Sequence, residues 1–340
     1  MSKLSNMMGW LSGGRLAWPA PGKSCLFRVR MATKLVLSFL LIILLVSGVF
    51  GLVGAWVIRN RVVAEAQARV QTDLNAAREI YLNKLASVND VVRFTADRMP
   101  LMNALLSGDT KQAEEALART REREKLDVLA VTDRNGRVLL RAGTGSQAGD
   151  DQSRDELVRA AIERAEPVAA ACVVSAEDLR RESPALAAQA YFKFIETQKA
   201  RARLQREESS GMMLKAAAPV LDSSHRVLGV VYGGVLLNRN FEIVDRIKQT
   251  VFQNLQYEGK DTGTATIFQD DLRISTNVKN EDGTRALGTR AAEEIYEEVV
   301  RKGRPWIGRA FVVNNWYIGA YEPIRDLTGR IIGMMYVGLL

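Results

Sequence analysis

A duplicated stretch near the end of the chain constrains its fold more than any other feature of the sequence. Residues 219–236 read PVLDSSHRVLGVVYGGVL and residues 323–340 read PIRDLTGRIIGMMYVGLL, so the copies are offset by 104 positions. Seven of the eighteen positions are identical, and most of the others exchange one apolar residue for another. A gapless match of this length favours duplication of one supersecondary unit over coincidence between two unrelated hairpins.

Each copy predicts a β-hairpin. Proline favours extended backbone in the residue before it, and the segments around Asp222 and Asp326 suit turns because short polar side chains bond nearby backbone groups. An apolar run rich in β-branched, aromatic and glycine residues follows, as in a buried strand. Strand–turn–strand patterns near Asp133 and Asp270 precede the two copies. We therefore expect two α+β modules, the first enlarged by a helix-prone insertion at 176–208.

The positive charge of the chain is confined to its beginning. The net charge is +8, yet residues 1–34 carry six Lys and Arg without an acid, whereas residues from Arg59 onward carry 41 basic and 39 acidic residues. The excess belongs to a tail, so we expect no nucleic-acid partner.

The residues that most often carry chemistry are scarce. Cys25 and Cys172 form neither a CxxC pair nor a disulfide framework, and the single histidine, His225, lies in a predicted solvated turn. We therefore expect no catalytic residues, no metal ligands and no cofactor, and we do not expect an enzyme.

An uncharged stretch of 24 residues, 35–58, exceeds the roughly 20 residues that a membrane-spanning helix needs. A cleaved signal peptide has a shorter apolar core, although an A-x-A-like site at Ala64–Ala66 keeps that alternative open. The basic tail 1–34 predicts a cytoplasmic N-terminus, with residues 59–340 in the periplasm beyond the inner membrane. Apolar residues spaced by three and four predict a long stalk helix at 59–100, which packs on its own domain or on a second copy.

The anchor, stalk and two modules resemble the Cache sensor regions of bacterial receptors. Residues 282–285 (DGTR), 288–290 (GTR) and 306–338 are similar to the fused Cache 3/Cache 2 type, found on sensor histidine kinases and methyl-accepting chemotaxis receptors. The resemblance implies PAS-like antiparallel sheets in a membrane-distal module at 101–240 and a membrane-proximal module at 241–340. It also implies an extracytoplasmic ligand site and a homodimer. Some relatives carry covalent haem, but this chain has no CxxCH motif.

The sequence departs from such receptors at its end. It stops at Leu340 before a second membrane span and has no kinase or methylation-helix segment. We therefore expect a fragment of a receptor that senses a small anionic metabolite, such as an organic acid. The alternative is a complete single-span binding or scaffold protein without an output domain.

A candidate ligand site lies in the second module. A hairpin turning at 314–315 would pair Val312 with Tyr317, Ala310 with Gly319 and Gly308 with Tyr321. The small residues ringed by Trp306, Tyr317 and Tyr321 would form a concave face, or would instead admit a packing helix. Arg309 beside Trp316 could bind a carboxylate or extend to water.

The loop at 279–290 offers arginines among glycines, which suits either a lid over an anion or a solvated loop. The predicted ligand-binding residues are therefore Arg285, Arg290, Trp306, Arg309, Trp316, Tyr317 and Tyr321. Weaker candidates in the first module are Arg141, Tyr191, Lys193 and Lys215. We assign Tyr232 and Tyr336 to the core.

Overall fold

The computed structural model describes residues 31–99, 101–103, 111–143, 148–257, 259–313 and 315–340. Most of the basic tail predicted at 1–34 therefore lies outside the described residues. The chain divides into two compact units, residues 1–60 and residues 61–340.

A single helix, α1 (Met31–Ala96), contains both the predicted membrane segment and most of the predicted stalk. Within the described residues it is the one helix that is long and apolar enough to cross a membrane. The large apolar side chains from Leu35 to Ile58 are exposed, as those of a lipid-facing helix would be.

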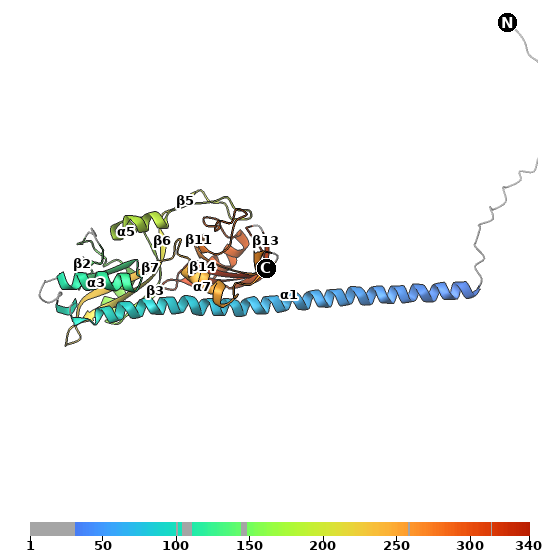
Figure 1. Cartoon of the computed structure of the whole chain (residues 1–340), viewed down its shortest axis with the longest axis horizontal. Helices are drawn as coiled ribbons and strands as arrows, with labels where there is room; N and C mark the ends of the chain where they lie inside the picture. Colours follow the sequence, from blue (N-terminus) through green and yellow to red (C-terminus); the bar gives the residue numbers. More distant parts are fainter. Residues whose placement is uncertain (1–30, 100, 104–110, 144–147, 258, 314) are drawn as a thin grey trace, which may run out of the picture. The chain divides into compact units, whose positions relative to one another are not determined.

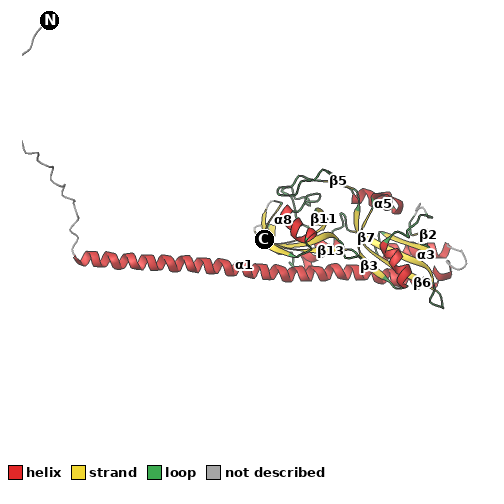
Figure 2. Ribbon diagram, turned by 180° about the vertical axis from the view of Figure 1, so that it is seen from behind, coloured by secondary structure: helices red, strands yellow, loops and turns green. Residues whose placement is uncertain are grey.

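Residues 61–340 form an α+β structure with two five-stranded antiparallel sheets, as predicted (Figures 1 and 2). The first sheet has the order β2-β1-β7-β6-β3 and the second has the order β11-β10-β14-β13-β12. The strands of the first are β1 (Val128–Asp133), β2 (Val138–Arg141), β3 (Val168–Val174), β6 (Gly211–Leu221) and β7 (Val227–Leu236). Those of the second are β10 (Gly263–Gln269), β11 (Leu272–Thr276), β12 (Trp306–Val312), β13 (Asn315–Arg325) and β14 (Ile331–Leu339).

The remaining elements are short. The helices are α3 (Lys111–Arg123), α4 (Glu156–Arg164), α5 (Ala176–Glu182), α6 (Pro184–Ala190), α7 (Glu242–Thr250) and α8 (Glu293–Ile295), and α8 continues as the π-helix η1 (Tyr296–Arg301). Two small ribbons pair β4 (Phe192–Lys193) with β5 (Glu207–Glu208), and β8 (Gln256–Tyr257) with β9 (Lys260–Asp261).

The sequence repeat corresponds to a structural repeat. β6 and β13 have the same length, and their bounds differ by the offset of 104. In both following turns an aspartate accepts hydrogen bonds from backbone amides two and four residues ahead, at Asp222 and at Asp326. His225 has φ 59° and is exposed in the first turn, as predicted, and Gly329 takes the equivalent position with φ 85°. The duplication predicted from the sequence is therefore confirmed at the level of topology and turn chemistry.

The stalk part of α1 packs on both sheets. Val70, Leu74, Ala77 and Tyr81 belong to a core shared with strands of both modules, whereas Val88 and Val92 belong to a core of the first module. The predicted apolar stripe thus packs on the chain's own domain.

The predicted helical insertion is only half helical. Ser183 ends α5 through its N–H and caps α6 through its side chain, and Pro184 occupies the first turn of α6. After Ala190 the chain is mostly without regular secondary structure, and residues 191–208 form a strap that reaches the second module. Arg201 and Arg203 of this strap donate to Asp271 at 3.0 and 3.1 Å. These ion pairs favour the extended strap over continued helix.

Two strand assignments also need correction. β3 was not expected from the sequence. It places the insertion between β3 and β6, whereas the equivalent strands of the second module, β12 and β13, are joined by a tight turn. In that turn Val313 has φ 59°, so Ala310 pairs with Tyr317 and Gly308 with Gly319. The predicted pairing was wrong by two residues, but a shift of two keeps every side chain on its predicted face.

We predict that Gly333→Ala will destabilise the chain by about 3 kcal/mol, the upper range for overpacking. A methyl group at Gly333 would lie 2.0 Å from the Phe268 carbonyl oxygen and 2.6 Å from the Met212 methyl. The control Gly329→Ala meets no atom within 4 Å and should cost about 1 kcal/mol, from its positive φ alone. Urea unfolding measures both, and equal costs would contradict the tight contact of β14 with β10.

Candidate functional site

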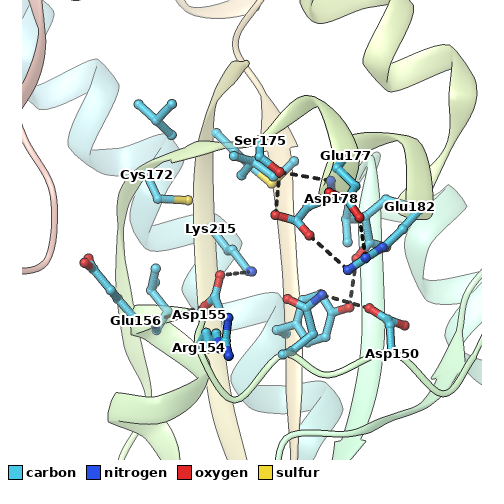
Figure 3. Close-up of a pocket in the computed structure, with 18 of the residues that line it drawn as sticks. Asp150, Arg154, Asp155, Glu156, Cys172, Ser175, Glu177, Asp178, Glu182 and Lys215 are labelled. Carbon is cyan, nitrogen blue, oxygen red and sulfur yellow. Dashed lines mark hydrogen bonds and ion pairs between the residues drawn. The ribbon is translucent and has the colours of Figure 1, made fainter. Parts of the chain in front are cut away.

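A cavity of about 810 Å³ lies in the first module, against the sheet face that α4 covers (Figure 3). Side chains from β2, β3, β6 and β7 form its floor, among them Arg141, Cys172, Lys215 and Tyr232. Its rim comes from the N-terminus of α4, from both ends of α5, from residues 148–154, and from Asp326 and Arg330. Strand alternation explains the floor, because these side chains point to one side of the sheet.

A buried guanidinium lies at one end of the floor. The Arg141 side chain is 2 % exposed and binds two carboxylates, Asp150 at 2.6 and 2.8 Å and Glu182 at 2.9 and 3.2 Å. The Tyr232 hydroxyl donates to the same Glu182 at 2.8 Å. Burial would raise the pKa of Asp150, but the hydrogen bonds from Arg141 and Gln152 outweigh it and lower that pKa to about 2. Burial and the charge of Glu182 raise the pKa of Tyr232, which keeps this donor protonated.

A buried ammonium lies beside it. Nζ of Lys215 donates to Asp155 at 2.6 Å and lies 4.6 Å from the centre of the Tyr232 ring (Figure 3). Asp155 caps α4, and its other carboxylate oxygen accepts from the amides of Leu157 and Val158. Burial would raise the pKa of Asp155, but the charge and hydrogen bond of Lys215 and the helix amides lower it. The same ion pair raises the pKa of Lys215 against its burial.

The lining as a whole is acidic. Ser175 caps α5 and donates to Asp178 at 2.6 Å, and Arg181 pairs with Glu177 on the same helix. Eight carboxylates line the cavity: Asp150, Asp151, Asp155, Glu156, Glu177, Asp178, Glu182 and Asp326. Five cationic side chains line it: Arg141, Arg154, Arg181, Lys215 and Arg330. The buried cations are each held by a carboxylate of the chain itself.

Of the weaker candidates in the first module, two line this cavity and two do not. Arg141 and Lys215 are on its floor. Tyr191 and Lys193 lie in the strap. The Tyr191 hydroxyl donates to Glu207 at 2.6 Å. Lys193 lies opposite Glu207 in the strand pairing of β4 with β5. Sequence reasoning missed Tyr232 as a lining residue, because an aromatic residue in an apolar strand is typical of a core.

Of the aromatic candidates of the second module, Tyr317 and Tyr321 lie in its core and Trp306 packs against that core, whereas Trp316 is 47 % exposed. Trp306 contacts Tyr321 edge to face, with ring centres 5.6 Å apart, and the Tyr321 ring lies tilted against that of Tyr336, with centres 4.6 Å apart. A methyl group at Gly308 would meet the Trp306 ring at 2.8 Å, and one at Gly319 would meet the Tyr336 ring at 3.0 Å. Ile295 and Val299 of α8 and η1 share this core with Tyr317 and Tyr321. The small residues therefore accommodate aromatic rings and a helix, and a ligand role for this face stays a prediction.

The arginine candidates of the second module are engaged in ion pairs or ring contacts. Arg285 binds both oxygens of Asp245 at 2.8 Å, and Arg290 binds the buried Asp271 at 2.5 and 3.1 Å. Arg309 lies over the Trp316 ring at 4.4 Å, which agrees with their predicted proximity. Their roles in ligand binding remain predictions.

Among known protein families, a model matches the second module of the chain. A family model described as single Cache domain 3 matches residues 235–340. No curated protein matches the chain. The expected fused two-module type stays a prediction, because the match covers one module.

Several solved structures are similar over most of the chain. The periplasmic domain of Vibrio cholerae LuxQ is 14 % identical with a TM-score of 0.44, covering 79 % of this chain and 98 % of that one. The sensor domain of the V. cholerae histidine kinase DctB is 11 % identical with a TM-score of 0.43, covering 81 % and 97 %. The ligand-binding domain of the Pseudomonas aeruginosa amino acid chemoreceptor PctB, solved with L-Gln, is 12 % identical with a TM-score of 0.38, covering 81 % and 89 %. At these scores the likeness carries no argument about function.

We predict that Lys215→Met will destabilise the chain by about 3 kcal/mol, because it leaves the Asp155 carboxylate without its cation beside a buried site. The double variant Lys215→Met/Asp155→Asn should recover part of this loss, since no unpaired charge remains. Lys193→Met on the exposed strap is the control and should change little. Urea unfolding measures the free energy of unfolding of all three variants. If Lys215→Met alone were as stable as the Lys193→Met control, the result would contradict a strong Lys215–Asp155 ion pair.

The Asp150–Arg141 pair predicts an acid-dependent loss of stability. The pKa of Asp150 is lowered from 3.8 to about 2 in the folded chain. The pair therefore stabilises the fold above pH 3.8, and this contribution disappears as the pH falls toward 2. We expect the destabilisation caused by Asp150→Asn to shrink steadily between those two pH values in urea titrations. A difference from the unsubstituted chain that stays constant over this range would contradict the ionised pair.

Proposed function

We propose that this chain is the membrane-anchored, extracytoplasmic sensor region of a bacterial signalling receptor, and that it binds a small polar ligand in the first-module cavity. The cavity carries this proposal, because its volume of about 810 Å³ suits a small molecule and its floor presents buried ionised and phenolic groups. The candidate membrane helix and the Cache match of residues 235–340 support it.

The proposed placement follows the sequence. The tail 1–34 is cytoplasmic, α1 anchors the chain in the inner membrane, and residues 59–340 lie in the periplasm as a homodimer. Binding shifts a conformational equilibrium of the modules, and the change passes across the membrane to a histidine kinase or chemoreceptor output. α1 supports this route because its stripe packs against both modules.

The lining favours a ligand that carries a cationic group, such as an amine or an amino acid. Carboxylates outnumber cations eight to five around the cavity. The anionic ligand expected from the sequence would have to displace Asp150 or Glu182 from Arg141, or Asp155 from Lys215. Each displacement would leave a carboxylate without its partner in a largely buried site, which is costly.

Thermal unfolding of the full chain in detergent, with a panel of amines, amino acids and organic acids, tests this proposal. We expect some amines or amino acids to raise the Tm, since a ligand at 100 times its Kd stabilises a protein by about 2.7 kcal/mol. Glu182→Gln should abolish the shift, because it weakens the Arg141 cluster, whereas Arg309→Ala in the second module should preserve it.

Three results would contradict the proposal or its charge argument. A panel without any stabilising compound would argue against direct sensing of these chemical classes. Stabilisation that survives Glu182→Gln but is lost in Arg309→Ala would place the ligand in the second module, where the main sequence candidates lie. Stabilisation by organic acids alone would overturn the charge argument.

A further inference from the structure

One wall of the first-module cavity belongs to the second module. Asp326 and Arg330, in the turn between β13 and β14, line the cavity together with residues of β3 and β6. The adjoining contacts hold this end of the second sheet against the first module. Gln269 donates to the Ser210 hydroxyl at 2.7 Å, and the Met212 methyl lies against Gly333.

The two copies of the repeat differ at this turn in a way that fits the contact. Leu327 in the second copy is partly buried against the core of the first module, whereas its counterpart in the first copy, Ser223, is exposed. The Asp326 side chain is 2 % exposed, and its turn is otherwise built like that of Asp222. Leu327 therefore distinguishes the turn of the second copy, which packs against the first module, from the turn of the first copy, in which the equivalent residue is the exposed Ser223.

The turn also presents a charge at the cavity. The Arg330 side chain is held to Asp326 at 2.9 Å and is 68 % exposed. The cations on the cavity floor, Arg141 and Lys215, are almost fully buried in pairs with carboxylates. A charge at an exposed position of the lining acts on any ion that enters the cavity.

We propose that the cavity is a composite site completed by Asp326 and Arg330, so that a ligand held by the first module also contacts the hairpin that leads into β14. That the cavity binds a ligand rests on the proposed function, whereas the composite wall does not. Arg330 then adjusts which ionic groups the site admits, and occupancy acts on the final strand of the second module without passing through α1.

Cys172 provides a probe that needs no identified ligand. Its thiol lines the cavity, and Cys25→Ser removes the other cysteine of the chain. The rates of reaction with trimethylammonioethyl methanethiosulfonate and with sulfonatoethyl methanethiosulfonate compare a cationic with an anionic reagent. Burial raises the pKa of this thiol to about 12, so the ratio of the two rates is used, which cancels the thiolate fraction.

The full chain is studied in detergent, and every form carries Cys25→Ser. Three forms are compared: one without a further substitution, one with Arg330→Glu and one with Arg226→Glu. Arg226 is the counterpart of Arg330 in the first copy and pairs with Asp222 in the same way, so it is a matched control. We expect Arg330→Glu to raise the cation-to-anion rate ratio about tenfold or more, and Arg226→Glu to change it less than twofold. Equal ratios in the two variants would overturn the composite wall.

A second variant separates docking from charge. Leu327→Ser gives the second turn the residue of the first, and we expect both reagents to react several-fold faster because the wall loosens. Unchanged rates for both reagents in this variant would also count against the composite wall. If the ligand panel fails while these rates change as expected, the sensing proposal falls and the composite wall stands. If the panel contains a stabilising compound while the rates do not change, the sensing proposal stands and the composite wall falls.

Discussion

The apolar stripe of α1 is the constraint on which both modules depend. Val70, Leu74, Ala77 and Tyr81 are buried in a core that includes residues of both sheets, and Val88 and Val92 continue the same stripe into the first module. One helix therefore supplies apolar surface to two sheets. A change in how either sheet packs alters contacts with this helix, which also carries the uncharged stretch that could anchor the chain. The proposed sensor role uses this arrangement.

Much of the fold could be read from local sequence, because its signals are local. The Pro–Asp hairpins, the buried stripe of α1 and the exposed turn at His225 follow from periodicity and turn chemistry. The strap could not be read in this way. Its helix-prone residues are extended because Arg201 and Arg203 bind Asp271, about 70 residues further along the chain. No local pattern reveals that partner. The two-residue error at β12–β13 arose similarly, from a turn that uses Val313 in a positive-φ conformation.

The site was predicted only in part, because the two modules use equivalent residues differently. Tyr232 and Tyr336 occupy the same place in the repeat. In the first module the hydroxyl group bonds Glu182 at a cavity, whereas in the second the ring covers Gly319 and the hydroxyl contacts Thr264. Lys215 stands where the second module has Gly319, and this lysine in an apolar strand was the best signal available. Its partner Asp155, and the Glu182 that binds Arg141 and Tyr232, come from helix ends that only the tertiary structure brings together. Among the described residues, equivalent positions of the repeat thus line a cavity in the first module and fill a core in the second.

Hydrogen–deuterium exchange of the full chain, with and without a stabilising compound, tests the central claim that the first module holds the ligand. The account predicts slower exchange in β3, at the N-termini of α4 and α5, and in residues 326–330, with little change around Arg309 and Trp316. Protection confined to β12 and β13 and to the loop at 279–290 would place the ligand in the second module and contradict it.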